Sequence, residues 1–214
     1  MAQHARIKQP PDIHSGRSPE TYISYEEFLA IADDDRPAEW VNGKVVHMAP
    51  VSDEHNALTY FLIRFIGEFV ETYQVGVIRH EPFQMKTGPS LSGREPDIFF
   101  VANENLSRLK KNHMDGPADL VVEIVSPESQ ERDRVEKYQE YQQGGVREYW
   151  LIDPERQEAI FYRRNAQGTY EPGPIREDGI YESAVLPGLR LRVSWLWQHP
   201  LPTLRSALAE LESR

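Results

Sequence analysis

A single acidic residue inside an apolar run constrains the fold of this chain more than any other feature of its sequence. Residues 119–126 read Asp-Leu-Val-Val-Glu-Ile-Val-Ser, and Pro127 follows them. A nearly unbroken apolar run of this length is typical of a central strand that is covered on both faces of its sheet. The run therefore predicts a layered protein with helices around a sheet, and it places the carboxyl group of Glu123 in the interior.

Glu123 has two interpretations at this position. An ionised carboxylate is costly to remove from water unless a cation or a metal ion lies beside it. One interpretation is a structural ion pair with an arginine or a lysine. The other is a functional carboxylate, because strongly perturbed acids gather at active sites. Side chains alternate along a strand, so Glu123 shares its face with Asp119, Val121 and Val125. The strand alone leaves both interpretations open.

Local patterns predict the helices. Ser24 and Glu27 have the spacing of a capping box at the start of a short helix over 24–35. Apolar residues at intervals of three and four predict a longer helix from Ser52 to about Tyr73. We also expect one helical turn near Leu106, a helix from Pro127 to about Gln143 that Gly144-Gly145 closes, and a last helix over 203–212.

Strand-like segments alternate with these helices. Asn42-Gly43 readily takes the positive φ angles of a tight turn, and it predicts a hairpin within 38–50. Further strands are expected at 75–86, 97–101, 119–125, 148–153 and 159–164, before short antiparallel strands that continue to about Val193. The unit over 119–152 should be a parallel, right-handed strand–helix–strand crossover. This order predicts an α/β or α+β fold with a mixed sheet flanked by helices.

We expect this fold to form one domain over residues 21–195. Residues 1–20 are rich in Pro, Gly, Ser and charge, which predicts a flexible tail, and residues 196–214 are expected to form a C-terminal helical arm. No run approaches the roughly 18 apolar residues that span a bilayer. Residues 1–20 also lack the apolar core of a secretory signal. We therefore expect no membrane partner, and the absence of cysteine fits a cytoplasmic protein.

Composition narrows the classes of function. The chain has no cysteine, which excludes disulfides, thiolate metal sites and a cysteine nucleophile. Its formal net charge is −10, whereas proteins that bind nucleic acid usually carry a basic surface. Composition therefore argues against tight, unassisted binding of nucleic acid.

Asp97 and Lys137 are the other candidates for chemistry. Asp97 follows Pro96 and opens an apolar strand. On a neighbouring strand it could share one hard cation with Glu123, because two carboxylates, waters and a substrate phosphate make a sufficient Mg²⁺ site. Its alternative is a turn or capping aspartate. Lys137 falls on the flank of the inward stripe of the next helix, from which its ammonium group could reach the rim of the sheet. Its alternative is an exposed lysine paired with Asp133.

Several segments taken together resemble the Uma-two family of restriction endonucleases. They are REPDIFFV at 94–101, DLVVEIVSP at 119–127, DRVEKYQEY at 133–141, GVREYWLIDP at 145–154 and, upstream, EWVNGKV at 39–45 with Met48-Ala-Pro and His55. The resemblance covers roughly residues 22–195. It implies the restriction-endonuclease-like fold of the PD-(D/E)XK superfamily.

By this resemblance, Asp97 supplies the aspartate of the PD motif and Glu123 supplies the acid of the second motif, both as catalytic metal ligands. The position two residues after Glu123, which holds lysine in the general motif, is Val125 here. The resemblance places the working lysine on the next helix, at Lys137. A lysine there could orient the attacking water or stabilise developing negative charge.

The leading hypothesis is a Mg²⁺- or Mn²⁺-dependent endonuclease that hydrolyses phosphodiester bonds of DNA and acts as a homodimer. Glu39 could add a metal contact, and His55 could act as a base or contact the substrate; packing roles are the alternative for both. The acidic charge and Val125 favour a second hypothesis, a nuclease-fold module that binds without cutting. A glycosidase-type hydrolase with two carboxylates is a third, but it leaves Lys137 unexplained.

Overall fold

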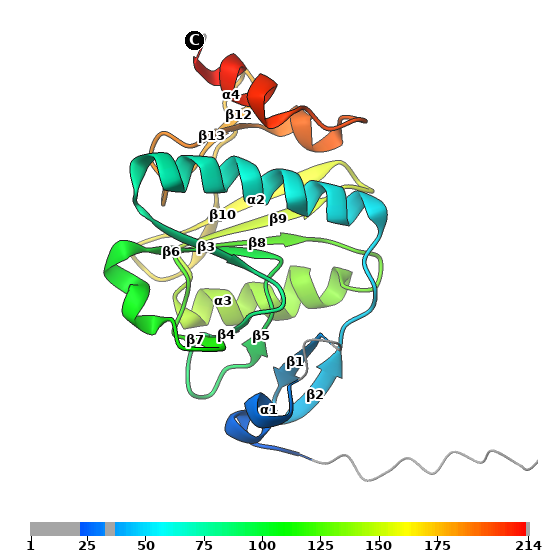
Figure 1. Ribbon diagram of the computed structural model, residues 1–214, viewed down its shortest axis with the longest axis vertical. Coiled ribbons are helices and arrows are strands. Elements are labelled where there is room, and N and C mark those ends of the chain that lie inside the picture. Colours follow the sequence, from blue (N-terminus) through cyan, green and yellow to red (C-terminus); the bar gives the residue numbers. More distant parts are fainter. Residues whose placement is uncertain (1–21, 33–36, 213–214) are drawn as a thin grey trace, which may run out of the picture.

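A six-stranded sheet lies at the centre of the computed structural model, which describes residues 22–32 and 37–212 (Figure 1). Its strands lie in the order β11, β10, β9, β8, β6, β3. Their bounds are Gly76–His80 for β3, Ile98–Ala102 for β6, Leu120–Ile124 for β8, Glu148–Asp153 for β9, Glu158–Arg164 for β10 and Tyr170–Pro172 for β11. The tail predicted for 1–20 lies outside the described residues.

The strand that carries Glu123 lies inside this sheet, between a parallel and an antiparallel neighbour. β8 pairs in parallel with β9, with Glu123 opposite Leu151, which confirms the predicted parallel crossover. On its other side β6 runs antiparallel, with Ile98 opposite Val122. Asp97 immediately precedes β6, so it lies at the same edge of the sheet as the C-terminal end of β8. The mixed sheet confirms the predicted fold class.

Helices cover both faces of this sheet (Figure 1). α2 (Asp53–Tyr73) crosses one face, and a π-helical turn, η2 (Arg132–Lys137), leads into α3 (Tyr138–Gly144) on the other face. α2 begins as predicted, because Ser52 Oγ accepts a hydrogen bond from the backbone N–H of His55 at 3.1 Å. The sequence predicted one regular helix from Pro127 to about Gln143, and it did not predict that residues 132–137 of this segment are π-helical.

Alternation along β8 sends its side chains into two separate cores. Leu120, Val122 and Ile124 are buried in the core that α2 covers. Val121 and Val125 are buried in the core that α3 covers, together with Tyr141. Since side chains alternate along a strand, Glu123 belongs to the α3 side.

A second sheet joins the N-terminal hairpin to three very short strands. Its order is β2, β1, β5, β4, β7, and its strands are β1 Ala38–Val41, β2 Lys44–His47, β4 Gln84–Lys86, β5 Gly93–Arg94 and β7 His113–Asp115. Positive φ angles of 50° at Asn42 and 86° at Gly43 confirm the predicted hairpin turn. The single strand predicted over 75–86 is two strands in different sheets, because Pro82 interrupts the ladder.

The first helix, α1 (Tyr25–Ile31), has the predicted capping box. Ser24 Oγ accepts from the N–H of Glu27 at 3.1 Å, and the Glu27 carboxylate accepts from the N–H of Ser24 at 2.7 Å. The helix ends at Ile31, and residues 33–35 of the predicted span lie outside the described residues. Its Tyr25 and Phe28 pack with the hairpin, so α1 belongs to the second sheet.

The C-terminal segment returns to the main core. It contains β12 (Ile180–Glu182), β13 (Arg190–Arg192), η3 (Val193–Trp197) and α4 (Leu204–Glu212), and η1 (Asn103–Arg108) is the helical turn expected near Leu106. Leu196 and Ala207 are buried in the core under α2, while the domain boundary at 195 stays a prediction. Within the described part of the chain, no helix combines the length and apolar character needed to cross a membrane.

Glu148, at the start of β9, is a second buried glutamate of the central sheet. Among the described residues, its carboxylate accepts hydrogen bonds from neutral donors only: Trp150 Nε1, Tyr181 OH, Ser183 Oγ and the backbone N–H groups of Ala184 and Val185. These donors satisfy both oxygens, so this carboxylate is stabilised without a contacting cation. It ties the C-terminal segment to the sheet.

Replacing Gly76 by Ala should destabilise the protein, because the new Cβ would lie 2.1 Å from the backbone oxygen of Val101 on β6. The expected loss is about 1–3 kcal/mol of unfolding free energy. Gly67 is the matched control: it lies in α2, nothing stands within 4 Å of its added Cβ, and Gly67→Ala should stabilise by about 0.5–1 kcal/mol. Urea unfolding of both variants tests this, and equal stabilities would contradict the close approach of β3 to β6.

Candidate active site

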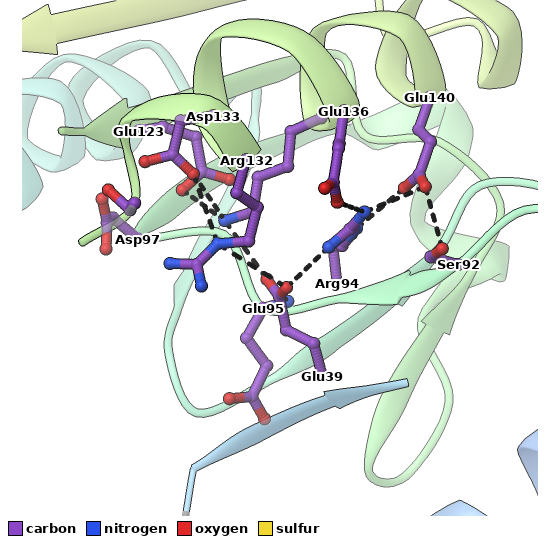
Figure 2. A network of polar contacts seen from close by, with 12 residues as sticks. Glu39, Ser92, Arg94, Glu95, Asp97, Glu123, Arg132, Asp133, Glu136 and Glu140 are labelled. Atoms are coloured by element: carbon purple, nitrogen blue, oxygen red, sulfur yellow. Dashed lines mark hydrogen bonds and ion pairs between the residues drawn. The ribbon is translucent and has the colours of Figure 1, made fainter. Parts of the chain in front are cut away.

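A cavity of about 240 Å³ opens where β8 ends and β6 begins. Its acidic lining residues are Glu81, Glu95, Asp97, Glu123, Glu128 and Asp133, and its basic ones are His47, His55, Arg132 and Lys137. Figure 2 shows Asp97, Glu123 and Asp133 close to one another although they come from different segments. The lining is therefore acidic overall, and it contains all three residues predicted to be catalytic.

The three predicted catalytic residues converge through direct contacts. Lys137 Nζ lies 2.9 Å from Glu123 Oε2, and Tyr141 OH donates to Glu123 Oε1 at 2.6 Å. Asp97 Oδ2 accepts from the backbone N–H of Ile124, the residue after Glu123, at 2.6 Å. The structure thus brings Asp97, Glu123 and Lys137 to one cavity, and their catalytic roles stay predictions.

Lys137 is buried rather than placed at an exposed rim. Its side chain is 2% exposed, and its Nζ also lies 3.2 Å from Glu39 Oε1 and 3.4 Å from Asp133 Oδ1. The pairing with Asp133, considered as the alternative for an exposed lysine, is therefore present in the interior. Both residues belong to the π-helical turn η2. Such turns are rare in proteins, but those that occur often lie at functional sites.

The charges in this cluster do not balance. Burial disfavours the ammonium form of Lys137, but attraction to Glu123, Glu39 and Asp133 outweighs it and raises the pKa of Lys137 above its ordinary value. Burial, reinforced by repulsion from Asp97 and Asp133, raises the pKa of Glu123 well above its ordinary value despite the attraction of Lys137. The acids outnumber the cations, which favours an additional proton or a bound cation at the cavity.

Glu39 anchors Lys137 from the hairpin. It is fully buried, and its Oε2 accepts from Arg94 Nη1 at 2.9 Å (Figure 2). Its Oε1 lies 3.2 Å from Lys137 Nζ. Although burial opposes ionisation, attraction to Lys137 and Arg94 lowers the pKa of Glu39. Arg94 is held in turn by Glu136 and Glu140. Both oxygens of Glu39 thus contact cations, and it does not line the cavity; its predicted metal contact stays a prediction.

His55 lies at the cavity wall, at the start of α2, as its position in the sequence suggested. Its Nε2 is 3.4 Å from Asp97 Oδ2. Burial acts to lower the pKa of His55, but the hydrogen bond and charge of Asp97 raise it overall. A raised pKa favours the imidazolium form, which suits contact with an anionic substrate better than the role of a base. Both roles stay predictions.

Glu95 is a cavity residue that the sequence analysis did not single out. Its side chain lies beside the second sheet, where its Oε1 accepts from Gln84 Nε2 at 2.7 Å and its buried Oε2 has no hydrogen-bond partner. Burial, reinforced by repulsion from Glu39 and Glu81, raises the pKa of Glu95 to about 7. The position of Glu95 directly before Pro96-Asp97 was the one sequence signal that could have marked it as a site residue. Its burial could not be predicted, because the strands that cover this loop are distant in the sequence.

The donor set fits a magnesium-type site better than a closed metal cage. Among residues 22–32 and 37–212, no group of three or more His, Asp or Glu side chains is arranged to hold a metal ion. Asp97 and Glu123, two of the predicted metal ligands, both line the cavity. Mg²⁺ keeps several waters and needs few carboxylates, whereas a structural zinc site needs four protein ligands. The residues present therefore fit a hydrated divalent cation that two carboxylates would hold.

A mixed sheet between helices, with carboxylates from neighbouring strands and a lysine at one edge, defines the class of nuclease-like α/β proteins. Residues 25–194 match the profile of the Uma2 family, described as "Putative restriction endonuclease", and the chain belongs to that family.

A solved structure of similar fold supports this class. It is the crystal structure of "a putative nuclease belonging to DUF820" from Anabaena variabilis ATCC 29413, with a TM-score of 0.67 and 20% sequence identity. The match covers 82% of this chain and 97% of that chain. Comparison with curated proteins gives no match.

Replacing Glu95 by Gln should stabilise the protein at high pH only. The folded pKa of about 7 lies above the ordinary value of 4.5, so ionisation of Glu95 costs stability progressively from about pH 4.5 to 7 and by a constant amount above it. Glu95→Gln avoids that cost and can still accept from Gln84. The expected gain is about 1–3 kcal/mol at pH 8 and near zero at pH 4.5.

Urea unfolding in EDTA at both pH values measures this difference. Glu171→Gln, which changes an exposed carboxylate, is the control and should shift stability little at either pH. A gain for Glu95→Gln that is the same at pH 4.5 and pH 8 would show that the pKa of Glu95 is not raised.

Replacing Lys137 by Met should cost about 3–5 kcal/mol of unfolding free energy, because three buried carboxylates lose a shared cation. Lys111→Met, at an exposed lysine, is the matched control and should be nearly neutral. Adding Glu123→Gln to Lys137→Met should recover part of the loss, since it removes one uncompensated charge. Near-wild-type stability of Lys137→Met in chemical denaturation would refute the dependence of these acids on Lys137.

Proposed function

We propose that this protein is a Mg²⁺- or Mn²⁺-dependent endonuclease that hydrolyses phosphodiester bonds of DNA. The observation that carries the proposal is the convergence of Asp97, Glu123 and Lys137, from separate segments, on one acidic cavity. Membership of the Uma2 family supports nuclease activity as the class of reaction. The metal dependence and the DNA substrate rest on the chemistry of the site.

The two carboxylates act as the metal-binding pair. Asp97 is fixed by the N–H of Ile124 through Oδ2, and no described residue forms a hydrogen bond or ion pair with its Oδ1, which leaves this oxygen available to a cation. Glu123 is fixed on both oxygens by Lys137 and Tyr141. A divalent ion bound here would polarise a phosphate and lower the pKa of a water. Pre-positioned carboxylates lower the reorganisation required during the reaction.

Lys137 acts mainly on the carboxylates. Its ammonium group holds Glu123 in one orientation and offsets part of the negative charge at the cavity wall. The side chain of Lys137 is 2% exposed, and Glu123 lies between its ammonium group and the cavity in this proposal. As a fixed, buried cation, Lys137 would stabilise the negative charge that develops on the phosphate without touching it. The lysine of the general motif is thus replaced by a cation that a helix supplies.

The acidic cavity makes substrate binding depend on divalent cations. A phosphodiester would be repelled by the lining carboxylates until a cation offsets their charge. The net charge of −10 points the same way. DNA as the substrate polymer and a symmetric dimer that reaches both strands are parts of this proposal.

A cleavage assay tests the proposal. Purified protein is incubated with supercoiled, linear and single-stranded DNA and with RNA, in Mg²⁺, in Mn²⁺ and in EDTA. DNA should be cut only with the metals. Asp97→Asn and Glu123→Gln should each lower the rate at least about 100-fold, the scale of losing one electrostatic catalytic group. Glu171→Gln, at an exposed acid outside the cavity, should cut like the wild type.

Two outcomes would count against the proposal. Cutting in EDTA, or unchanged cutting by both cavity variants, would place the activity elsewhere. Metal-dependent binding of DNA without any cutting would favour the alternative of an inactive binding module. Two observations favour that alternative: Val125 occupies the motif-lysine position and is buried, and Lys137 is itself enclosed.

A further inference from the structure

Arg132 lines the cavity with a guanidinium group that the protein uses only in part. Its Nε lies 3.7 Å from Asp133 Oδ1 and 4.0 Å from Glu39 Oε2. At these distances Nε makes no hydrogen bond. Within the described residues, nothing accepts a hydrogen bond from the two terminal nitrogens. The side chain is 22% exposed, so the terminal nitrogens remain open to a ligand.

Neighbouring arginines differ in this respect. Arg94 is enclosed, and its nitrogens donate to Glu39, Glu136 and Glu140. Arg134, two residues after Arg132, contacts Asp153 and Glu158. These arginines have structural partners that use their terminal nitrogens. Arg132 is therefore distinct among the arginines of this region.

Arg132 is also the lining cation that is best placed to meet a ligand. Lys137, the other cavity cation with a fixed charge, is shared by three carboxylates. In Figure 2 the terminal nitrogens of Arg132 point away from the dashed contacts, toward the side on which Asp97 lies. Glu39 and Asp133 lie near Nε and restrain the Arg132 side chain at that atom. This restraint reduces the conformational entropy that the side chain would lose on binding a ligand.

We propose that Arg132 binds a phosphate of the nucleic-acid substrate through its two terminal nitrogens. A planar guanidinium matches two non-bridging phosphate oxygens in a bidentate contact, which a lysine cannot reproduce. Because Arg132 and Asp97 line the same cavity, this contact would hold the phosphodiester near the proposed metal-binding carboxylates. The inference rests on the proposed function and adds to it the residue that receives the anionic group.

The kinetic test compares Arg132→Gln and Arg132→Lys with the wild type on duplex DNA in Mg²⁺ at several salt concentrations. Arg132→Gln should raise KM at least 10-fold and change kcat less. It should also flatten the slope of log kcat/KM against log salt by about 0.9, the loss of one phosphate contact. Arg132→Lys should recover the slope but only part of the affinity. Arg176→Gln, an exposed arginine distant in sequence, should match the wild type.

A second probe keeps this inference separate from the nuclease proposal. Inorganic phosphate, added with Mg²⁺, should raise the Tm of the wild type and of Arg176→Gln but not that of Arg132→Gln. If no nucleic acid is cut yet phosphate stabilises the protein through Arg132, the inference stands without the nuclease. If cutting occurs with the same KM, salt slope and phosphate response in Arg132→Gln, the inference fails and the nuclease proposal stands. Absence of both cutting and phosphate binding overturns both.

Discussion

The rest of the site depends on the ion pairs that the ammonium group of Lys137 forms with three carboxylates. This group lies within 3.4 Å of carboxylates from three elements: Glu39 of β1, Glu123 of β8 and Asp133 of η2. Each of these acids is buried, and removing their shared cation would leave charges that the interior cannot solvate. The contact therefore fixes the second sheet, the central strand and the π-turn relative to one another. For this reason the hairpin is part of the site and not only an addition to the fold.

Two buried glutamates on neighbouring strands show why burial alone does not identify a functional acid. Glu148 is satisfied by five neutral donors that close around it. Glu123 lines the cavity, shares the ammonium group of Lys137 with Glu39 and Asp133, and is repelled by the charge of Asp97. Both carboxylate oxygens of Glu148 therefore have hydrogen-bond donors from the protein. The arrangement around Glu123 retains an excess of negative charge at the cavity wall, and on our proposal this excess favours a bound divalent cation.

The sequence predicted those elements that local pattern determines. The run around Glu123, the apolar spacing of α2 and the Asn42-Gly43 turn each produced the expected structure. It did not predict β5 and β7, nor the break that separates β3 from β4, because two or three residues carry no periodicity and their partners are distant in the chain. For the same reason it could not separate Glu148 from Glu123, since the Tyr181 hydroxyl that satisfies Glu148 lies 33 residues away. Lys137 was expected on a helix flank, but the helix is π-helical there and its ammonium group is enclosed.

The position of Val125 explains why a helix supplies the cation. Val125 is 3% exposed and packs in the core under α3, so the strand position that holds lysine in the general motif serves packing here. Lys137 comes from η2, and Asp133, four residues earlier in the same turn, forms an ion pair with it. The same turn also carries Arg132, whose terminal nitrogens are open where those of Lys137 are not. One helical turn thus separates two tasks that a single motif lysine would combine: Lys137 holds the acids in place, and Arg132, on our proposal, receives the phosphate.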